Sequence, residues 1–225
     1  MSGTVLAVRP QPGLSKTIRA GEAMGLNIIG YPLFEIRARD WDCPGPDSID
    51  ALLIGSANAI RHGGGQLARL TGKPVHAVGE ATARAARKAG FEVASIGVGG
   101  LQNVLDTLEG PLRLLRLAGE EHVELDPPAG VAIDTRIVYH AAPLELPEPL
   151  RPLADLGLTV LLHSAAAARQ FAHETRRLAM DRSRLSLVVI GPRVRQAAGE
   201  GWRAIHVAPE PSDAAMLEMV KEMCI

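Results

Sequence analysis

The sequence predicts an α/β protein built from two similar domains, each with a parallel sheet. Short apolar strands alternate with helices of ordinary length, one strand–helix pattern occurs twice, and two proline-containing segments interrupt the alternation. Alternation at this spacing is typical of βαβ units, in which neighbouring strands run parallel. A chain of 225 residues is long enough to bury the cores of two such domains.

The predicted strands are short apolar runs bounded by turn residues or by helical patterns. The first of them stops at Arg9-Pro10, because proline cannot continue the ladder of hydrogen bonds. In chain order the predicted strands are Val5–Val8, Leu26–Tyr31, Leu33–Ile36, Ala51–Ile54, Val75–Val78, Val93–Ile96, Leu112–Leu117, Val131–Tyr139, Leu158–Leu162, Leu185–Ile190 and Ala204–Val207.

The predicted helices follow most of these strands. The first has apolar residues at Leu14, Ile18 and Met24, which is helical spacing, and Gly25 marks its end. In chain order the predicted helices are Ser15–Met24, a helix from about Ala57, Ala81–Ala89, Leu101–Leu108, Ala165–Ala179, Arg193–Ala198 and Asp213–Met223.

An internal repeat supports the division into two similar domains. Residues 52–62 read LLIGSANAIRH and residues 160–170 read VLLHSAAAARQ, so that Ser56 and Ser164 stand at the same place after an apolar strand. Further along, Gly79 corresponds to Gly191 and Gly90-Phe91 corresponds to Gly201-Trp202. Strand–Gly–helix is a common pattern, but four landmarks in the same order favour a duplicated unit over coincidence.

Two segments, 37–46 and 139–149, are predicted to be linkers because they contain several prolines. If both cross between domains, residues 47–138 form an inserted second domain. Residues 1–36 and 150–225 then form a discontinuous first domain, since two strands and one helix cannot bury a core alone. We therefore expect two similar flavodoxin-like domains, joined by a two-stranded linker, with a ligand cleft between them.

Composition excludes several classes of function. A net charge of −1 and 3% aromatic residues disfavour binding to nucleic acid or to an anionic membrane. No apolar run is as long as a membrane span, and the first residues do not resemble an export signal. Two cysteines, Cys43 and Cys224, cannot form a disulfide framework. We expect a soluble cytoplasmic protein, monomeric by default.

The candidate binding residues lie where strands end and helices begin. Ligands of parallel α/β sheets bind at this edge, where helix N-termini present free N–H groups. Four motifs fall there, namely Gly55-Ser56-Ala57, Gly79-Glu80-Ala81-Thr82, His163-Ser164-Ala165 and Gly191-Pro192-Arg193. Their hydroxyl groups serve either as helix caps or as ligands for carboxylates or phosphates, and the sequence leaves both roles open.

Four arginines lie near predicted strand ends or a linker: Arg9, Arg116, Arg136 and Arg193. Exposure to solvent is the expectation for each, and clamping of an anionic ligand is the alternative. Arg9 and Arg193 enter the predicted binding site. The histidines show no metal-ligand spacing, and Gly97-Val98-Gly99-Gly100 is not a dinucleotide-binding fingerprint, so we expect no metal and no nucleotide cofactor.

Taken in order, the motifs resemble those of the uroporphyrinogen-III synthase family over nearly the whole chain. The matching segments are Val5-Leu6-Ala7-Val8-Arg9-Pro10, Leu53-Ile54-Gly55-Ser56-Ala57-Asn58-Ala59, Val78-Gly79-Glu80-Ala81-Thr82-Ala83, Ile137-Val138-Tyr139 with Pro143, Leu161-Leu162-His163-Ser164, Ile190-Gly191-Pro192 and Ala208-Pro209-Glu210-Pro211-Ser212. Each motif is short, and the resemblance rests on their ordered sum.

The resemblance implies a hydro-lyase that cyclises hydroxymethylbilane to uroporphyrinogen III, with loss of water and inversion of the terminal pyrrole ring. It implies no cofactor. Ser56, Thr82 and Ser164 would contact the acetate and propionate arms of the substrate, together with Gly79, Gly191 and Pro192. Tyr139 would lie in the cleft and assist departure of the hydroxyl group, although a tyrosine packed at an interface is the structural alternative.

The chain departs from the family pattern at several binding positions. Gly55 and His163 stand where the family often has threonine, and Arg193-Val194 replace hydroxyl-bearing residues. The Arg-Gly of the family appears as Ala118-Gly119, with Arg116 two positions earlier. These departures leave open an alternative function, a non-catalytic hinge-bending protein that binds a small anionic metabolite.

Overall fold

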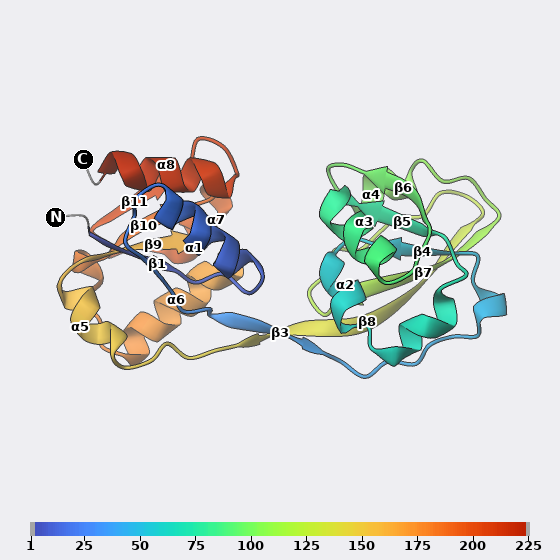
Figure 1. Cartoon of the computed structure of the whole chain (residues 1–225), viewed down its shortest axis with the longest axis horizontal. Coiled ribbons are helices and arrows are strands. Elements are labelled where there is room, and N and C mark those ends of the chain that lie inside the picture. The colour runs from blue at the N-terminus through green and yellow to red at the C-terminus, as the bar shows by residue number, and fades with distance from the viewer. Residues whose placement is uncertain (1–2, 224–225) are drawn as a thin grey trace. The chain divides into compact units, whose positions relative to one another are not determined.

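The computed structural model describes residues 3–223, so Cys224 lies outside the described residues. The chain divides into two compact units. Unit 1 comprises Met1–Glu35 and Ala142–Ile225, and unit 2 comprises Ile36–Ala141. Each unit is built around its own parallel sheet with helices on both faces, as Figure 1 shows, so the predicted α/β class with two parallel sheets is confirmed.

The sheet of unit 1 has five parallel strands in the order β11-β10-β9-β1-β2. They are β1 (Thr4–Ala7), β2 (Ile28–Gly30), β9 (Leu158–Leu162), β10 (Ser186–Val189) and β11 (Ala204–Val207). In chain order this arrangement is 2-1-3-4-5, the flavodoxin-like order. The central strands are almost fully buried, because both of their faces are covered by helices.

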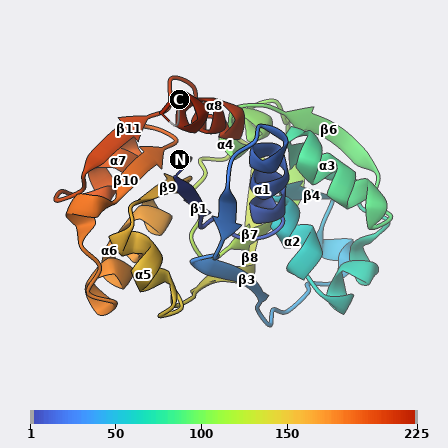
Figure 2. The ribbon, with the colours of Figure 1, turned by 60° about the vertical axis from the view of Figure 1, so that its left-hand side comes forward.

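Each face of this sheet carries its own set of helices. Helices α5 (Leu150–Asp155), α6 (Ala165–Arg177) and α7 (Pro192–Ala198) cover one face, and the grouping can be followed in Figure 2. Helices α1 (Gly13–Ala23) and α8 (Asp213–Met223) cover the other face.

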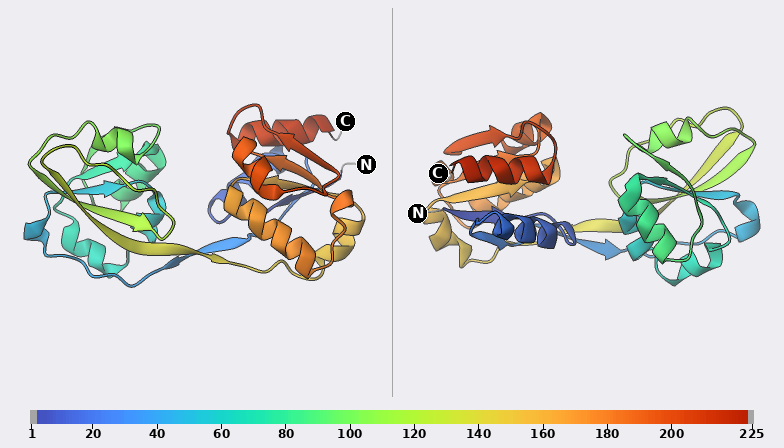
Figure 3. Two further views of the ribbon diagram at one scale, coloured as in Figure 1. Left: turned by 180° about the vertical axis from the view of Figure 1, so that it is seen from behind. Right: turned by 45° about the horizontal axis from the view of Figure 1, so that its top comes forward.

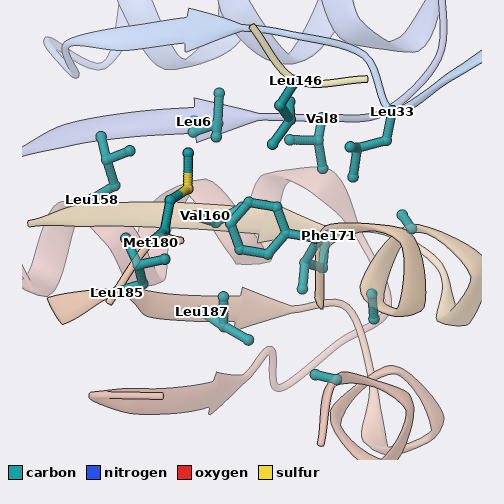
Figure 4. Close-up of a cluster of buried hydrophobic side chains, with 14 of the residues drawn as sticks. Leu6, Val8, Leu33, Leu146, Leu158, Val160, Phe171, Met180, Leu185 and Leu187 are labelled. Carbon is teal, nitrogen blue, oxygen red and sulfur yellow. The ribbon is translucent and has the colours of Figure 1, made fainter. Parts of the chain in front are cut away.

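The larger core of unit 1 lies beneath α5, α6 and α7. Phe171 of α6 is fully buried there among strand side chains that include Leu6, Val160 and Leu187, as Figure 4 shows. Leu146, from the segment before α5, reaches the same core. Buried Glu174 accepts a hydrogen bond from the Leu146 amide at 2.7 Å and holds this segment against α6.

The second sheet has six strands in the order β3-β8-β7-β4-β5-β6. They are β3 (Phe34–Ala38), β4 (Ala51–Ile54), β5 (Val75–Val78), β6 (Val93–Gly97), β7 (Leu112–Gly119) and β8 (Val131–Pro143). Strands β4 to β8 are parallel to their neighbours. In chain order these five strands stand as 3-2-1-4-5, which differs from the order in unit 1.

The helices of unit 2 are shorter. Helices α2 (Ala57–His62) and α3 (Gly79–Lys88) pack side by side on one face of the sheet, as Figure 3 shows. Helix α4 (Leu101–Leu105) covers the other face together with part of the 120–130 segment. Residues 120–130 form no helix. Short 3-10 helices lie at Pro46–Ser48, Gly65–Leu70 and, in unit 1, Arg182–Arg184.

The boundaries between the units lie inside two paired strands. The chain passes from one unit to the other within β3 and again within β8, and these two strands are paired. Within the predicted linker 139–149, β8 continues to Pro143, residues 144–149 form neither helix nor strand, and α5 begins directly after them at Leu150. Helix α5 tolerates Pro152 because the first turn of a helix has no intrahelical acceptors for its N–H groups. Prolines there do not exclude a helix.

Among residues 3–223, no helix combines the length and the apolar character that a membrane crossing requires.

Candidate functional site

Both predicted serines cap helices at the carboxyl ends of strands. Ser56 is the N-cap of α2, and its hydroxyl oxygen accepts a hydrogen bond from the Asn58 amide at 3.2 Å. Ser164 is the N-cap of α6 and accepts from the Ala167 amide at 3.1 Å. A capping serine uses its oxygen as an acceptor and keeps its O–H proton for another partner. The two roles left open by the sequence are therefore compatible.

The glycines of the second motif pair begin α3 and α7. Gly79 is the first residue of α3 and has φ +73°, a left-handed conformation that other residues adopt only with strain. Gly191 is extended and precedes Pro192, the first residue of α7, where proline is well accommodated. Arg193 is exposed. The helix starts expected from the sequence are thus present in both units.

Thr82 differs from the other predicted binding residues because it is buried. It lies in the second turn of α3, and the residue is 4% exposed. This low exposure favours a packing role for the side chain over direct contact with a ligand. We therefore leave Thr82 out of the proposed contacts and assign its side chain to packing beneath α3.

Tyr139 lies in the wall of a cavity that belongs entirely to unit 2. The cavity has a volume of about 240 Å³ and is lined by Gly55, Ser56, Val78, Gly100, Leu101, Arg116, Leu117, Ala118, Gly119, Glu121, His122, Val123 and Tyr139. The tyrosine ring lies directly over Gly119, where a Cβ atom would stand 2.6 Å from Cζ. Glycine at 119 therefore makes room for the ring beside the cavity.

Arg116 shares this cavity, and the sequence-based expectation of an exposed side chain is wrong for it. The residue is 5% exposed, and its Nε has no hydrogen-bond partner among the described residues. Burial lowers the pKa of the guanidinium below its ordinary value, because the charged form is poorly solvated. Arg116 also lines a second cavity of about 310 Å³ beneath the 120–130 segment.

Arg9 belongs to a polar cluster at the corresponding edge of unit 1. Its Nη1 lies 3.4 Å from Oδ1 of Asp213 and 3.4 Å from the Thr17 hydroxyl. Thr17 donates to Asp213 at 2.9 Å, and Nε2 of His163 lies 2.6 Å from Asp213 Oδ1. Asp213 and Thr17 are not among the predicted site residues, since they are 196 residues apart and meet only through the fold.

The electrostatics of this cluster favour an ionised Asp213. Burial raises the pKa of Asp213, but hydrogen bonds from His163 and Thr17 and the nearby charge of Arg9 outweigh that effect. The net result is a pKa below the ordinary value. Arg9 therefore has a carboxylate partner within its own unit, in contrast to Arg116.

A larger cavity in unit 1, of about 590 Å³, lies between α7 and β11. Pro192 is the one predicted site residue in its wall; the other lining residues are Arg195, Gln196, Gly199, Glu200, Gly201, Trp202 and Ile205. Its size exceeds that of the cavity at Tyr139. Ser56 and Gly79 of unit 2, and Ser164 and Gly191 of unit 1, lie instead at the carboxyl ends of strands, where binding in this fold class is expected.

Comparison with known proteins identifies a family. A family model described as uroporphyrinogen-III synthase HemD matches residues 15–218. A search among curated proteins found no match. Among solved structures, a uroporphyrinogen-III synthetase from Helicobacter pylori aligns with a TM-score of 0.68 and 19% identity, covering 99% of this chain and 100% of that one. A mutant uroporphyrinogen III synthase from Thermus thermophilus aligns with a TM-score of 0.47 and 16% identity, covering 98% of each chain.

Proposed function

The chain belongs to the uroporphyrinogen-III synthase family, and we propose that it cyclises hydroxymethylbilane to uroporphyrinogen III. The family match over residues 15–218 carries this proposal, because it spans both units and nearly the whole length. The reaction removes water and joins the ends of the linear tetrapyrrole with its terminal ring inverted. By that chemistry the enzyme is a hydro-lyase.

The chemical demand on the protein is mainly one of orientation. Once the hydroxyl group has left, the bilane is a reactive electrophile that closes spontaneously without inversion. The enzyme must hold the chain so that the last ring attacks through its substituted carbon and then rearranges. Correct positioning of reacting groups can lower a barrier by about 7–11 kcal/mol in favourable systems.

The helix starts of both units suit the carboxylate arms of this substrate. Ser56 and Ser164 keep a donor proton while capping α2 and α6. The backbone N–H groups near Gly79 and Gly191 lie at the N-termini of α3 and α7, which attract negative charge. We propose that these groups bind acetate and propionate arms. A substrate lying between the two units remains a prediction of the sequence, as do the monomeric state and a cytoplasmic location.

We assign Tyr139 the role of assisting departure of the hydroxyl group. Its ring borders the cavity of unit 2, next to Gly119, so a bound pyrrole could lie beside the phenol. A phenol can donate a hydrogen bond or a proton to a leaving oxygen.

Incubation of the purified protein with fresh hydroxymethylbilane, followed by separation of the type I and type III products, tests the function. Type III product formed faster than the spontaneous type I product is the expected result. Type I product alone, at the uncatalysed rate, would instead favour the non-catalytic anion-binding protein.

The same assay tests Tyr139. We expect Tyr139→Phe to lower kcat by more than tenfold while leaving KM nearly unchanged, because the ring remains and only the donor is lost. A loss smaller than about tenfold would remove Tyr139 from the mechanism as an essential acid. Tyr31, an exposed tyrosine of unit 1, supplies the control Tyr31→Phe, for which no change is expected.

A further inference from the structure

Arg116 is a buried positive charge without a partner in the described part of the chain. It is 5% exposed, no salt bridge or hydrogen bond to its guanidinium occurs there, and its Nε is buried and unpaired. Burial without a partner disfavours the charged form of the guanidinium, which is why its pKa is lowered. A ligand that supplies a negative charge would offset this cost.

The register of the two sheets shows how this arginine comes to be buried. Ser56 and Ser164 occupy the same place after the central strands β4 and β9, and the residue three positions earlier is Leu53 in one and Leu161 in the other. Leu53 pairs with Arg116, and Leu161 pairs with Ala7. Arg116 therefore stands in unit 2 where fully buried Ala7 stands in unit 1.

The covering of this position differs between the units. Ala7 belongs to the core that α1 and α8 close. The equivalent of α1 in unit 2 is the 120–130 segment, which forms no helix and leaves cavities of about 240 and 310 Å³. Arg116 lines both cavities. A small ligand group that enters either cavity can therefore reach the side chain of Arg116.

The other charged groups around these cavities do not neutralise Arg116. Glu121 lines the first cavity and Glu124 lines the second, but neither forms a salt bridge with it in the described residues. His122 lines both cavities, and its Nδ1 is held by the Gly119 carbonyl at 2.9 Å. The planar guanidinium offers N–H groups in a fork that matches the two oxygens of a carboxylate.

We propose that Arg116 is the carboxylate-binding residue of unit 2 and that it takes one acetate or propionate arm of the substrate in the cavity beside Tyr139. This inference rests on the proposed function for the identity of the arm. Because Arg116 and Tyr139 border the same cavity, an arm held by the arginine brings its pyrrole ring next to the phenol. Arg116 thereby selects for a substrate that carries carboxylates.

The test compares Arg116→Met with the wild-type protein and with Arg113→Met. Methionine fills the space without the charge, and Arg113 is an exposed arginine of the same strand that pairs with Asp50 at 2.7 Å. We expect Arg116→Met to raise KM about 10- to 100-fold, the usual effect of losing a hydrogen bond to a charged group. Arg113→Met should leave KM unchanged. The KM of Arg116→Lys should lie between those of the wild type and Arg116→Met, because lysine keeps the positive charge but lacks the paired N–H groups of the guanidinium.

Thermal unfolding separates a ligand-binding role from a structural one. Because Arg116 has no hydrogen-bond or salt-bridge partner among residues 3–223, Arg116→Met should melt no lower than the wild type. A lower melting temperature for Arg116→Met, or an unchanged KM, would overturn the assignment.

A binding measurement keeps this inference separate from the proposed function. Uroporphyrin III, the oxidised macrocycle, retains the acetate and propionate arms and requires no turnover. Its fluorescence titration should show binding to the wild type and to Arg113→Met, and binding at least about tenfold weaker to Arg116→Met. If the wild type forms only type I product, the proposed function fails, yet this titration still decides whether Arg116 binds carboxylates. Equal affinity in all three proteins would refute the inference.

Discussion

The five strands of the sheet in unit 1 and strands β4 to β8 of unit 2 have the same spatial arrangement, but the chain passes through them in a different order. In both, the central strand is followed by a serine-capped helix, with β9 and Ser164 in unit 1 and β4 and Ser56 in unit 2. Starting from these strands, β9-β10-β11-β1-β2 correspond to β4-β5-β6-β7-β8. Unit 1 is thus a circular permutation of unit 2, interrupted where unit 2 is inserted. The two units therefore have similar layers of strands and helices although the chain enters each sheet at a different strand.

The carboxyl edges of the two units differ in chemistry at equivalent positions. Unit 1 has Arg9 paired with Asp213, and unit 2 has Ala118 and Leu101 at the corresponding places. His163 of unit 1 corresponds to Gly55. In unit 1 the polar side chains pair with one another at this edge, whereas the apolar residues and the glycine of unit 2 border a cavity beside Arg116, whose Nε has no partner among residues 3–223. The same sheet edge thus carries polar side chains that pair with one another in unit 1 and a cavity beside Arg116 in unit 2.

The largest expected effect on this comparison comes from Asp213→Ala. Asp213 accepts from the fully buried Thr17 hydroxyl and contacts His163, so its removal leaves buried polar groups unpaired. We expect the free energy of unfolding of unit 1 to fall by about 2–4 kcal/mol. Unfolding in urea measures the loss of free energy of unfolding, and hydrogen exchange shows in which unit the loss occurs.

Asp213→Asn serves as the matched control, because it keeps an acceptor for Thr17 and should cost less than alanine. Amides of unit 2 should keep their protection in both variants. Equal loss of protection from hydrogen exchange in the two units would contradict the view that the polar cluster stabilises unit 1 alone.

A smaller effect is expected in the pH dependence of stability. The pKa of Asp213 is lower in the folded protein than its ordinary value of 3.8. The ionised form therefore stabilises the fold above about pH 4, and this contribution is lost as the pH falls through the folded pKa. Unit 1 should lose protection from hydrogen exchange in this acid range, and Asp213→Asn should flatten that dependence.

Asp50 of unit 2 provides the contrast. Hydrogen bonds from Arg113 lower its pKa to about 2, but the pair is exposed and is screened by solvent. Asp50→Asn should therefore change the acid profile of unit 2 far less than Asp213→Asn changes that of unit 1. A larger change at Asp50 would contradict the contrast.

The smallest effects are expected at the two serine caps. Ser56→Ala and Ser164→Ala should each lower the free energy of unfolding by about 1 kcal/mol, because each removes one acceptor for a helix N–H group. Similar losses in both units would support the structural equivalence of α2 and α6. Replacement by threonine, which retains the cap, should restore most of the stability.

Much of the architecture could be predicted from the sequence because periodicity and breaks are local. The strands at Ala51–Ile54, Val75–Val78 and Leu158–Leu162 have the predicted bounds. The helix α5 could not be found in this way, because Pro149 before it and Pro152 within it indicate a break unless the place of Pro152 in the first turn is known. Likewise β8 continues to Pro143, because pairing with a neighbouring strand extends it past the residues whose pattern marks it.

The positions of the candidate site residues could be predicted only in part. Ser56, Gly79, Ser164 and Gly191 lie at strand ends and helix starts as expected, because such places have recognisable residues. The burial of Arg116 could not be found, since it depends on the absence of a helix over residues 120–130 and on the cavities left there.

The amino-acid sequence by itself determined the alternation of strands and helices, the repeated serine caps and the family to which the chain belongs. These features arise from neighbouring residues, whose spacing fixes which face of an element is apolar. Only the tertiary structure decided which arginine is paired and which is not. Arg9 and Asp213 are far apart in the chain and meet at one sheet edge, and Arg116 has no such partner in the described residues. Charge pairing depends on distances between side chains in the folded protein, and the number of residues between two side chains along the chain does not determine those distances.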